Sequence, residues 1–127
     1  IIDGANMGLF LKYGNFFLSK FAQGLFPRSA TSLNDCGCTF RLMSRDAYRK
    51  ISPFFSCGGS AFGMELTLLC LRCRIPMCQI PLQYGPRVGE STVTGSFWKA
   101  LELGLLMLGM ILKHRFVEFV QPLSKEP

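Results

Sequence analysis

Two charged side chains stand where they could take part in a transfer reaction. Glu65 lies in the expected first turn of a helix, where a carboxylate could act as a general base on an acceptor hydroxyl. Arg87 lies in the glycine-flanked stretch GPRVGES, where its guanidinium could hold a phosphate through two hydrogen bonds. Gly89 would let that loop move, and Ser91 could add a hydroxyl donor. The ordinary alternatives are a first-turn acid favoured by the helix dipole and a solvated arginine in a surface turn.

Three further charged residues lie in or beside a predicted strand. Asp35 precedes this strand, and Arg41 lies within it. Either the two residues line a binding site, or Asp35 caps the loop and Arg41 pairs with it. Arg45, together with Arg49 and Lys50, forms either a basic edge that faces a phosphate or a solvated helix face.

The spacing of apolar residues predicts helices that alternate with strands. Helices are expected over about 13–26, 46–51, 63–73 and 96–116, and strands over about 38–44 and 75–84. Gly14 and Asn15 mark the start of the first helix and Pro27 its end, while Ser44 caps the second. This order indicates an α/β fold. Because two strands rarely bury the faces of a sheet, we expect an incomplete mixed sheet whose other half lies outside this chain.

The composition fits one folded domain. The chain has 127 residues, of which 49% are hydrophobic and 17% charged, which is enough for a core and unlike a disordered segment. It starts at Ile1 and shows no signal peptide, so we expect it to begin inside a longer reading frame. The net charge of +6 suits an anionic partner such as a sugar nucleotide or an anionic membrane surface. Because the basic residues form no long run, nucleic acid is not expected as a partner.

Six cysteines allow three interpretations. They are Cys36, Cys38, Cys57, Cys70, Cys73 and Cys78. Buried thiols in a reducing compartment are favoured, because most of them lie in apolar stretches and no secretion signal is seen. Three disulfides or a zinc site are the alternatives, although a zinc site would need two ligands from an apolar helix.

Three stretches, in the same order along the chain as in the family, resemble family 2 glycosyltransferases of the GT-A type, especially the dolichyl- and polyprenyl-phosphate sugar synthases. The first is DCGCTFRLMSR at 35–45, which is similar to the family's aspartate, small residues, Gly-Phe-Arg and strand ending in Ser-Arg. The second is FGMEL at 62–66, and the third is QIPLQYGPRVGES at 79–91. The resemblance covers about residues 13–115. Thr39, Gln79 and Thr92 depart from the family's usual residues, which leaves the subfamily and the acceptor open.

This resemblance implies a fold, a reaction and a set of site residues. It implies that residues 1–95 are the carboxy-terminal, acceptor-side half of a GT-A domain in an inverting glycosyltransferase. The donor would be a nucleotide-diphosphate sugar and the acceptor a lipid phosphate or a glycan. Glu65 would be catalytic, and the phosphate- and substrate-binding residues would be Arg87, Gly89, Ser91, Asp35, Arg41 and Arg45.

The resemblance also implies a divalent cation, Mg or Mn, in the full-length enzyme. The chain contains no Asp-x-Asp motif, so the cation's ligands are expected outside it and the chain alone is expected to be inactive. No metal site is expected within these residues.

The last predicted helix, 96–116, precedes a polar tail at 117–127. Its apolar run of 12 residues is shorter than the roughly twenty that a spanning helix needs. It therefore suits either an interfacial helix with a basic end at lipid head groups or a helix packed on the missing half. We expect a cytoplasmic enzyme, peripheral to the cytoplasmic face of a membrane. The alternative function is a non-catalytic basic binding module for membrane or nucleic acid.

Overall fold

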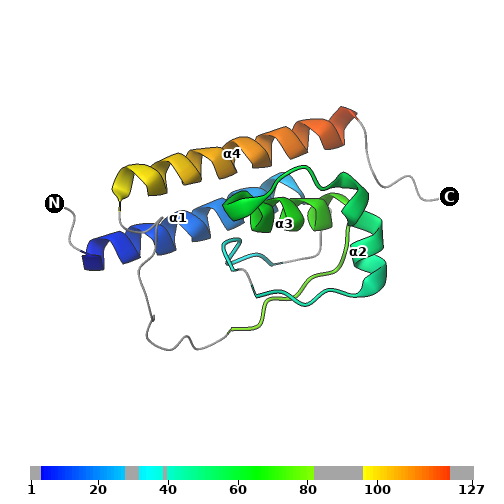
Figure 1. Ribbon diagram of the computed structural model, residues 1–127, viewed down its shortest axis with the longest axis horizontal. Helices are drawn as coiled ribbons and strands as arrows, with labels where there is room; N and C mark the ends of the chain where they lie inside the picture. Colours follow the sequence, from blue (N-terminus) through cyan, green and yellow to red (C-terminus); the bar gives the residue numbers. More distant parts are fainter. Residues whose placement is uncertain (1–3, 28–31, 39, 82–95, 121–127) are drawn as a thin grey trace.

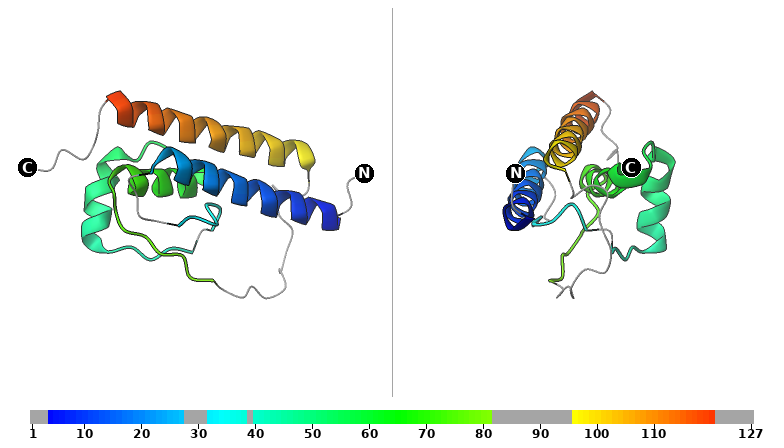
Figure 2. Two further views of the ribbon diagram at one scale, coloured as in Figure 1. Left: turned by 180° about the vertical axis from the view of Figure 1, so that it is seen from behind. Right: turned by 60° about the vertical axis from the view of Figure 1, so that its left-hand side comes forward.

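Three long helices lie side by side in the computed structural model, which describes residues 4–27, 32–38, 40–81 and 96–120. They are α1 (Gly4–Leu25), α3 (Phe62–Arg72) and α4 (Phe97–Val120). Helices α1 and α4 contact each other and run in the same direction, and α3 packs against α4 (Figure 1). The short helix α2 (Arg45–Ile51) contacts α3 and crosses the end of the group, as the second view in Figure 2 shows. Two 3-10 turns, Ser52–Phe54 and Gly59–Ala61, lead from α2 into α3.

The α/β prediction, with its incomplete mixed GT-A sheet, is wrong. The part of the chain that the structure describes contains helices and no strand. The predicted strands at 38–44 and 75–84 have no regular structure over 40–44 and 75–81, and Thr39 and residues 82–84 lie outside the description. The physical reason is that the second segment is joined by a side chain, rather than by a backbone ladder, to residues 34 and 35, which lie ahead of the first. Gln79 Oε1 accepts hydrogen bonds from the backbone N–H groups of Asn34 (2.7 Å) and Asp35 (3.2 Å), and the Gln79 amide donates to the Asp35 carbonyl.

The helix predictions agree with the structure apart from the start of α1 and the end of α4, which continues to Val120 and so includes the first residues of the predicted polar tail at 117–127. Helix α2 has Ser44 as its N-cap, whose hydroxyl accepts from the Ala47 N–H at 3.2 Å, and α1 ends at Leu25, ahead of Pro27. Helix α1 begins at Gly4 rather than near Gly14, so Gly14 and Asn15 lie inside the helix. No helix among the described residues combines the length and hydropathy that crossing a bilayer requires.

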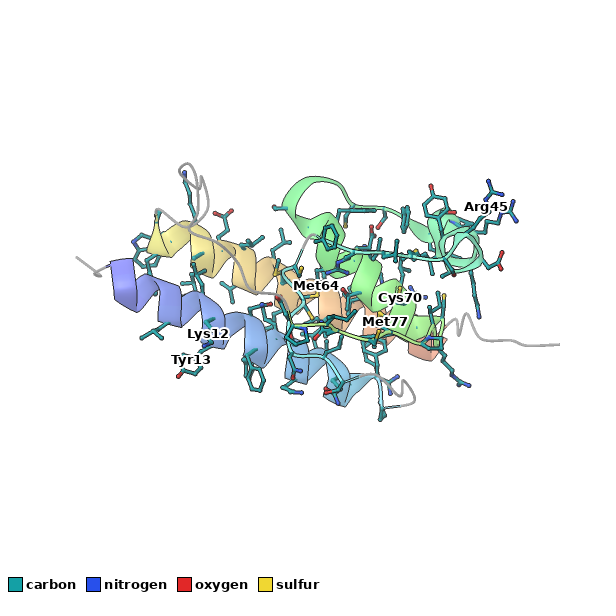
Figure 3. The ribbon with its side chains drawn as sticks, turned by 90° about the horizontal axis from the view of Figure 1, so that it is seen from below. Lys12, Tyr13, Arg45, Met64, Cys70 and Met77 are labelled. Carbon is teal, nitrogen blue, oxygen red and sulfur yellow. The ribbon has the colours of Figure 1, made fainter. Side chains whose placement is uncertain are left out.

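The core consists of two adjoining clusters. The larger joins α1, α3 and α4 through Leu18, Ala22, Phe26, Leu33, Cys36, Met64, Leu68, Leu71 and Ile111. The smaller joins α2 to the outer side of α3 through Ile51, Leu69, Cys70 and Cys73. Met77 packs against both clusters and lies between Met64 and Cys70 in Figure 3. Each fully buried side chain of this size stabilises the fold by about 1.5–3 kcal/mol, so this packing fixes α3 relative to its neighbours.

The end of α3 is closed by a Schellman motif whose left-handed residue is an arginine. Arg74 has φ 52°, its N–H donates to the Leu71 carbonyl, and the Ile75 N–H donates to the Cys70 carbonyl. Ile75 also packs against the smaller cluster, as the hydrophobic contact of this motif requires. A side chain with a Cβ is strained in this conformation, whereas glycine is not.

We therefore expect Arg74→Gly to raise the free energy of unfolding by about 1 kcal/mol, because the strain at positive φ is relieved. Arg49→Gly is the matched control, since it makes the same change at an exposed position inside α2. That control should lower the stability by about 1 kcal/mol, as glycine does in a helix interior. Urea unfolding followed by circular dichroism measures both. A loss of stability in Arg74→Gly would contradict the strain argument.

Candidate functional site

An irregular turn around Asp35 lies against α1. Asp35 Oδ1 accepts hydrogen bonds from the backbone N–H groups of Gly37 (2.7 Å) and Cys38 (3.1 Å). It also accepts from Asn15 Nδ2 at 2.6 Å. Asn15 Oδ1 in turn accepts from the N–H groups of Cys36 (3.2 Å) and Gly37 (3.1 Å). Asp35 therefore caps its own loop, and Asn15 holds that loop on α1.

Arg41 ties the same turn to α3. Its Nε donates to the Cys38 carbonyl and its Nη2 to the Cys36 carbonyl, both at 2.9 Å. Its Nη1 donates to Thr67 Oγ1 at 2.5 Å, and the Thr67 hydroxyl donates to the Gly63 carbonyl. All three nitrogens of the guanidinium thus donate within the chain, to oxygens other than those of the Asp35 carboxylate.

Glu65 is buried and holds the segment between α2 and α3. Its carboxylate accepts from the Ser56 N–H (3.0 and 3.1 Å), the Ser56 hydroxyl (2.5 Å) and the Cys57 N–H (3.0 Å). Burial alone would raise the pKa of the Glu65 carboxyl, but these hydrogen bonds outweigh burial and lower the pKa below its ordinary value. In this arrangement Glu65 is a weak base, and both of its oxygens are occupied.

Arg45 lies apart from this group. It is exposed at the start of α2 next to the exposed Arg49 and Lys50, which gives α2 a basic outer edge. Figure 3 shows Arg45 at the far end of the protein from Lys12 and Tyr13 of α1. Arg87, Gly89 and Ser91 lie outside the described residues. The structure therefore brings Asp35 and Arg41 together in one turn beside α3, which carries Glu65, and leaves Arg45 on a separate edge.

Buried thiols line the core near these residues. Burial raises the pKa of the Cys36 and Cys73 thiols, and it raises that of Cys70 to about 11, so all three remain protonated at neutral pH. Among the described residues, no group of three or more His, Cys, Asp or Glu side chains could hold a metal ion. The three buried cysteines therefore serve as apolar core residues there.

A buried basic pair joins α3 to α4 close to Glu65. Arg72 Nη1 and His114 Nδ1 are 3.3 Å apart, and both side chains are buried. Burial, followed by the positive charges of Arg72 and Lys113, lowers the pKa of His114, while the Glu65 carboxylate partly opposes this. His114 is therefore neutral at neutral pH.

Sequence reasoning missed the side chains that position the site. Asn15, Gln79, Thr67 and Ser56 each bond to a segment that is remote in sequence or irregular in structure. Asn15 carried a usable signal, because it is a polar residue on the side of α1 that also bears Leu18 and Ala22. Gln79, Thr67 and Ser56 show no signal in a single sequence that would predict their hydrogen bonds.

Comparison with known proteins gives one distant relationship. No protein-family model matches the chain, and no solved structure matches it. Among curated proteins, the chain is similar to a dolichyl-phosphate beta-glucosyltransferase of Saccharomyces cerevisiae, with 31% identity over 70 residues. The match includes 55% of this chain and 21% of the yeast protein, so the chain spans about a fifth of the length of the relative it matches. This is a weak indication of a relationship to glycosyltransferases, and it supports the transferase class alone.

The Glu65 contacts predict a cost for removing one carboxylate oxygen. Glu65→Gln should lower the free energy of unfolding by about 1.5–3 kcal/mol, because an amide NH₂ would face the backbone N–H donors of Ser56 and Cys57. Because the folded pKa is lowered, the wild-type carboxylate stabilises the fold above the ordinary pKa of 4.5, and this contribution is lost as the pH falls below it. Denaturant unfolding at neutral pH measures the loss. The exposed Glu102→Gln is the control and should change the stability by less than about 0.5 kcal/mol; equal effects of the two changes would refute the role of Glu65.

The buried pair predicts a pH dependence in a different range. The folded pKa of His114 lies below the ordinary value of 6.5, so the unfolded chain binds the extra proton more readily. Stability should therefore be full above about pH 7 and fall as the pH drops below 6.5, where protonation would place two cations side by side. Unfolding curves between about pH 7.5 and 5 test this. His114→Gln should flatten the curve in that range, and an unchanged slope would assign the dependence to another group.

Proposed function

We propose that this chain is part of an inverting glycosyltransferase that moves a sugar from a nucleotide-diphosphate donor to a lipid-phosphate acceptor. The observation that carries the proposal is the similarity to the yeast enzyme, whose name specifies glucosyl transfer and dolichyl phosphate. The resemblance of residues 35–45, 62–66 and 79–91 to the same class of enzymes supports it.

The state of Glu65 favours a phosphate over a glycan hydroxyl as the acceptor. A hydroxyl needs a base to remove its proton as it attacks the anomeric carbon, whereas a phosphate is already ionised at neutral pH. A buried carboxylate with a lowered pKa and four hydrogen bonds is poorly suited to accept that proton. In this proposal Glu65 positions residues 56–57, and the acceptor supplies its own nucleophilic oxygen.

In this proposal, two groups of residues would meet the phosphates. Arg87, with Gly89 and Ser91, would hold the diphosphate of the donor or the phosphate of the acceptor. Arg45 at the exposed edge of α2 would face a lipid phosphate. Asp35 and Arg41 would shape the acceptor side by fixing the turn between them, since the Arg41 guanidinium donates within the chain.

The donor site and the metal belong to the rest of the enzyme in this proposal. A divalent cation, Mg or Mn, would neutralise the diphosphate of the departing nucleotide. Among the described residues, no group of three or more His, Cys, Asp or Glu side chains could hold such an ion, and in this proposal its ligands lie outside this chain. Because the acceptor is a lipid, we place the enzyme in the cytoplasm, peripheral to the cytoplasmic face of a membrane.

A transfer assay tests the proposal on the full-length parent protein in membranes. Labelled nucleotide sugars are supplied one at a time with polyprenyl phosphate and Mg or Mn, and sugar that becomes extractable into organic solvent is counted. Arg87→Ala should lower the transfer rate about 10²–10³-fold, because charge stabilisation of the phosphates is lost. Arg87→Lys should recover part of it, since the charge remains and the two-pronged geometry does not.

Arg74→Ala is the control, because it removes an exposed guanidinium from a turn outside the proposed site. It should leave the rate unchanged. Full activity in Arg87→Ala would remove this residue from the site, and no transfer from any nucleotide sugar would refute the proposed function itself.

A non-catalytic basic binding module is the second candidate. It is favoured by one observation, namely that Arg41 and Glu65 are both engaged in bonds that hold the chain together. This candidate expects the parent protein to bind anionic membranes or nucleic acid while failing to consume any nucleotide sugar.

A further inference from the structure

Helix α1 has a second apolar face, and most of it is exposed in the described structure. We define the aromatic stripe as Leu9, Phe10, Tyr13, Phe16 and Phe17, which are all exposed. Their spacing places them on one side of the helix, opposite the core residues Leu18 and Ala22. Figure 3 shows Tyr13 projecting away from the interior that contains Met64 and Cys70. A stripe of large apolar residues on the outer side of a helix marks an interaction site.

The aromatic stripe continues onto the start of α4. The ring of Phe10 lies 5.1 Å from that of Phe97, and the Phe97 ring lies 5.8 Å from that of Trp98. Trp98 is itself 75% exposed. The two helices, which pack side by side, thus present one connected aromatic surface near the beginning of both (Figure 1).

Charge identifies the partner of this surface. Helix α1 contains Lys12 and Lys20 and no acidic residue, and Lys99 follows Trp98 on α4. Lys20 Nζ lies 5.5 Å from the centre of the Phe16 ring and donates a hydrogen bond to Gln23 Oε1 at 3.3 Å, so its charge stands beside the apolar stripe. Amphipathic aromatic rings with lysines beside them match the boundary between lipid tails and anionic head groups.

We propose that the aromatic stripe of α1, with Trp98, docks on the surface of an anionic lipid bilayer. The aromatic rings enter the boundary region, and Lys12 and Lys20 meet the lipid head groups. Sequence reasoning weighed an interfacial role for the helix at 96–116 against packing on the missing half. The proposal places the membrane contact on α1, which has the denser exposed aromatic face. The inference deepens the proposed function by naming the surface that brings the chain to its lipid acceptor, and it rests on that function only for the acceptor's identity.

Vesicle sedimentation tests the docking without any sugar donor. The purified chain is mixed with vesicles of phosphatidylcholine, either alone or with about 30% phosphatidylserine. We expect binding to the anionic vesicles that weakens as salt is added, because the lysine contribution is screened. Lys12→Gln with Lys20→Gln should weaken that binding about tenfold or more, since each lysine near an anionic surface contributes about fivefold.

The apolar contribution is tested by Tyr13→Gln with Phe17→Gln, two residues that are 67% and 61% exposed. This pair should reduce binding about tenfold or more while preserving the helical circular dichroism, because exposed glutamines fit a helix well. The matched control is Leu112→Gln with Phe116→Gln on α4, which are 50% and 69% exposed. The control should change binding by less than about twofold, since these residues lie outside the aromatic surface.

Three results would overturn the proposal. Loss of binding in the α4 control and not in the α1 variant would assign docking to α4. Absence of vesicle binding together with a dimer that Tyr13→Gln and Phe17→Gln dissociate, seen by sedimentation equilibrium, would identify a second copy of the chain as the partner. Absence of both would mean that a protein surface covers the stripe. None of these results depends on sugar transfer. If the vesicle experiment overturns the membrane proposal, the transfer assay still tests the proposed function separately.

Discussion

Residues 34–38 contain backbone amides and carbonyls that no helix or sheet satisfies, and the rest of the site depends on how they are paired. Asn15 and Asp35 accept from the amides, and Arg41 donates to the carbonyls of Cys36 and Cys38. A buried backbone group without a partner costs about 1–3 kcal/mol, so this pairing matters most at Cys36, which is the buried residue of the turn. Their bonds seat the turn between α1 and α3, where Cys36 enters the core.

The same constraint links the interior to the surface through α1. Asn15 must face the turn, and Leu18 and Ala22 must face α3 and α4, which fixes the rotation of α1 about its axis. Because helical residues three and four apart share a face, the side that carries Tyr13 and Phe17 then has to point outward. The aromatic face is therefore exposed because the packing of the opposite side of α1 fixes the rotation of the helix.

Local signals were sufficient for the helices and for one site interaction. Apolar spacing, the Ser44 cap and Pro27 set α2, α3, α4 and the end of α1, and Asp35 was correctly weighed as a loop cap. The strands were wrong because alternation of apolar residues predicts an extended segment but not a neighbour to pair with. What pairs with Asn34 and Asp35 is the Gln79 side chain, and a contact between residues so far apart leaves no mark in local spacing. The aromatic residues of α1 stand at helical spacing in the sequence, but a sequence does not show which of two apolar faces of a helix becomes buried.

Some charged side chains are bonded within the chain, whereas others lie at the surface, where they could meet a ligand. Glu65 and Arg41 are charged residues in the stretches that resemble family 2 glycosyltransferases. Both form hydrogen bonds with neighbouring backbone and hydroxyl groups. Such groups are pre-organised but have little capacity left for a substrate, since each additional bond would require breaking an existing one. Lys12 of α1 and the basic edge of α2 are exposed, whereas Lys20 is partly buried and donates to the neutral Gln23 side chain. In the proposed reaction, an acceptor with its own negative charge and its own nucleophile would need cations and an apolar surface from this chain more than a base. The described residues offer exposed cations at Lys12 and along α2, and apolar side chains along α1.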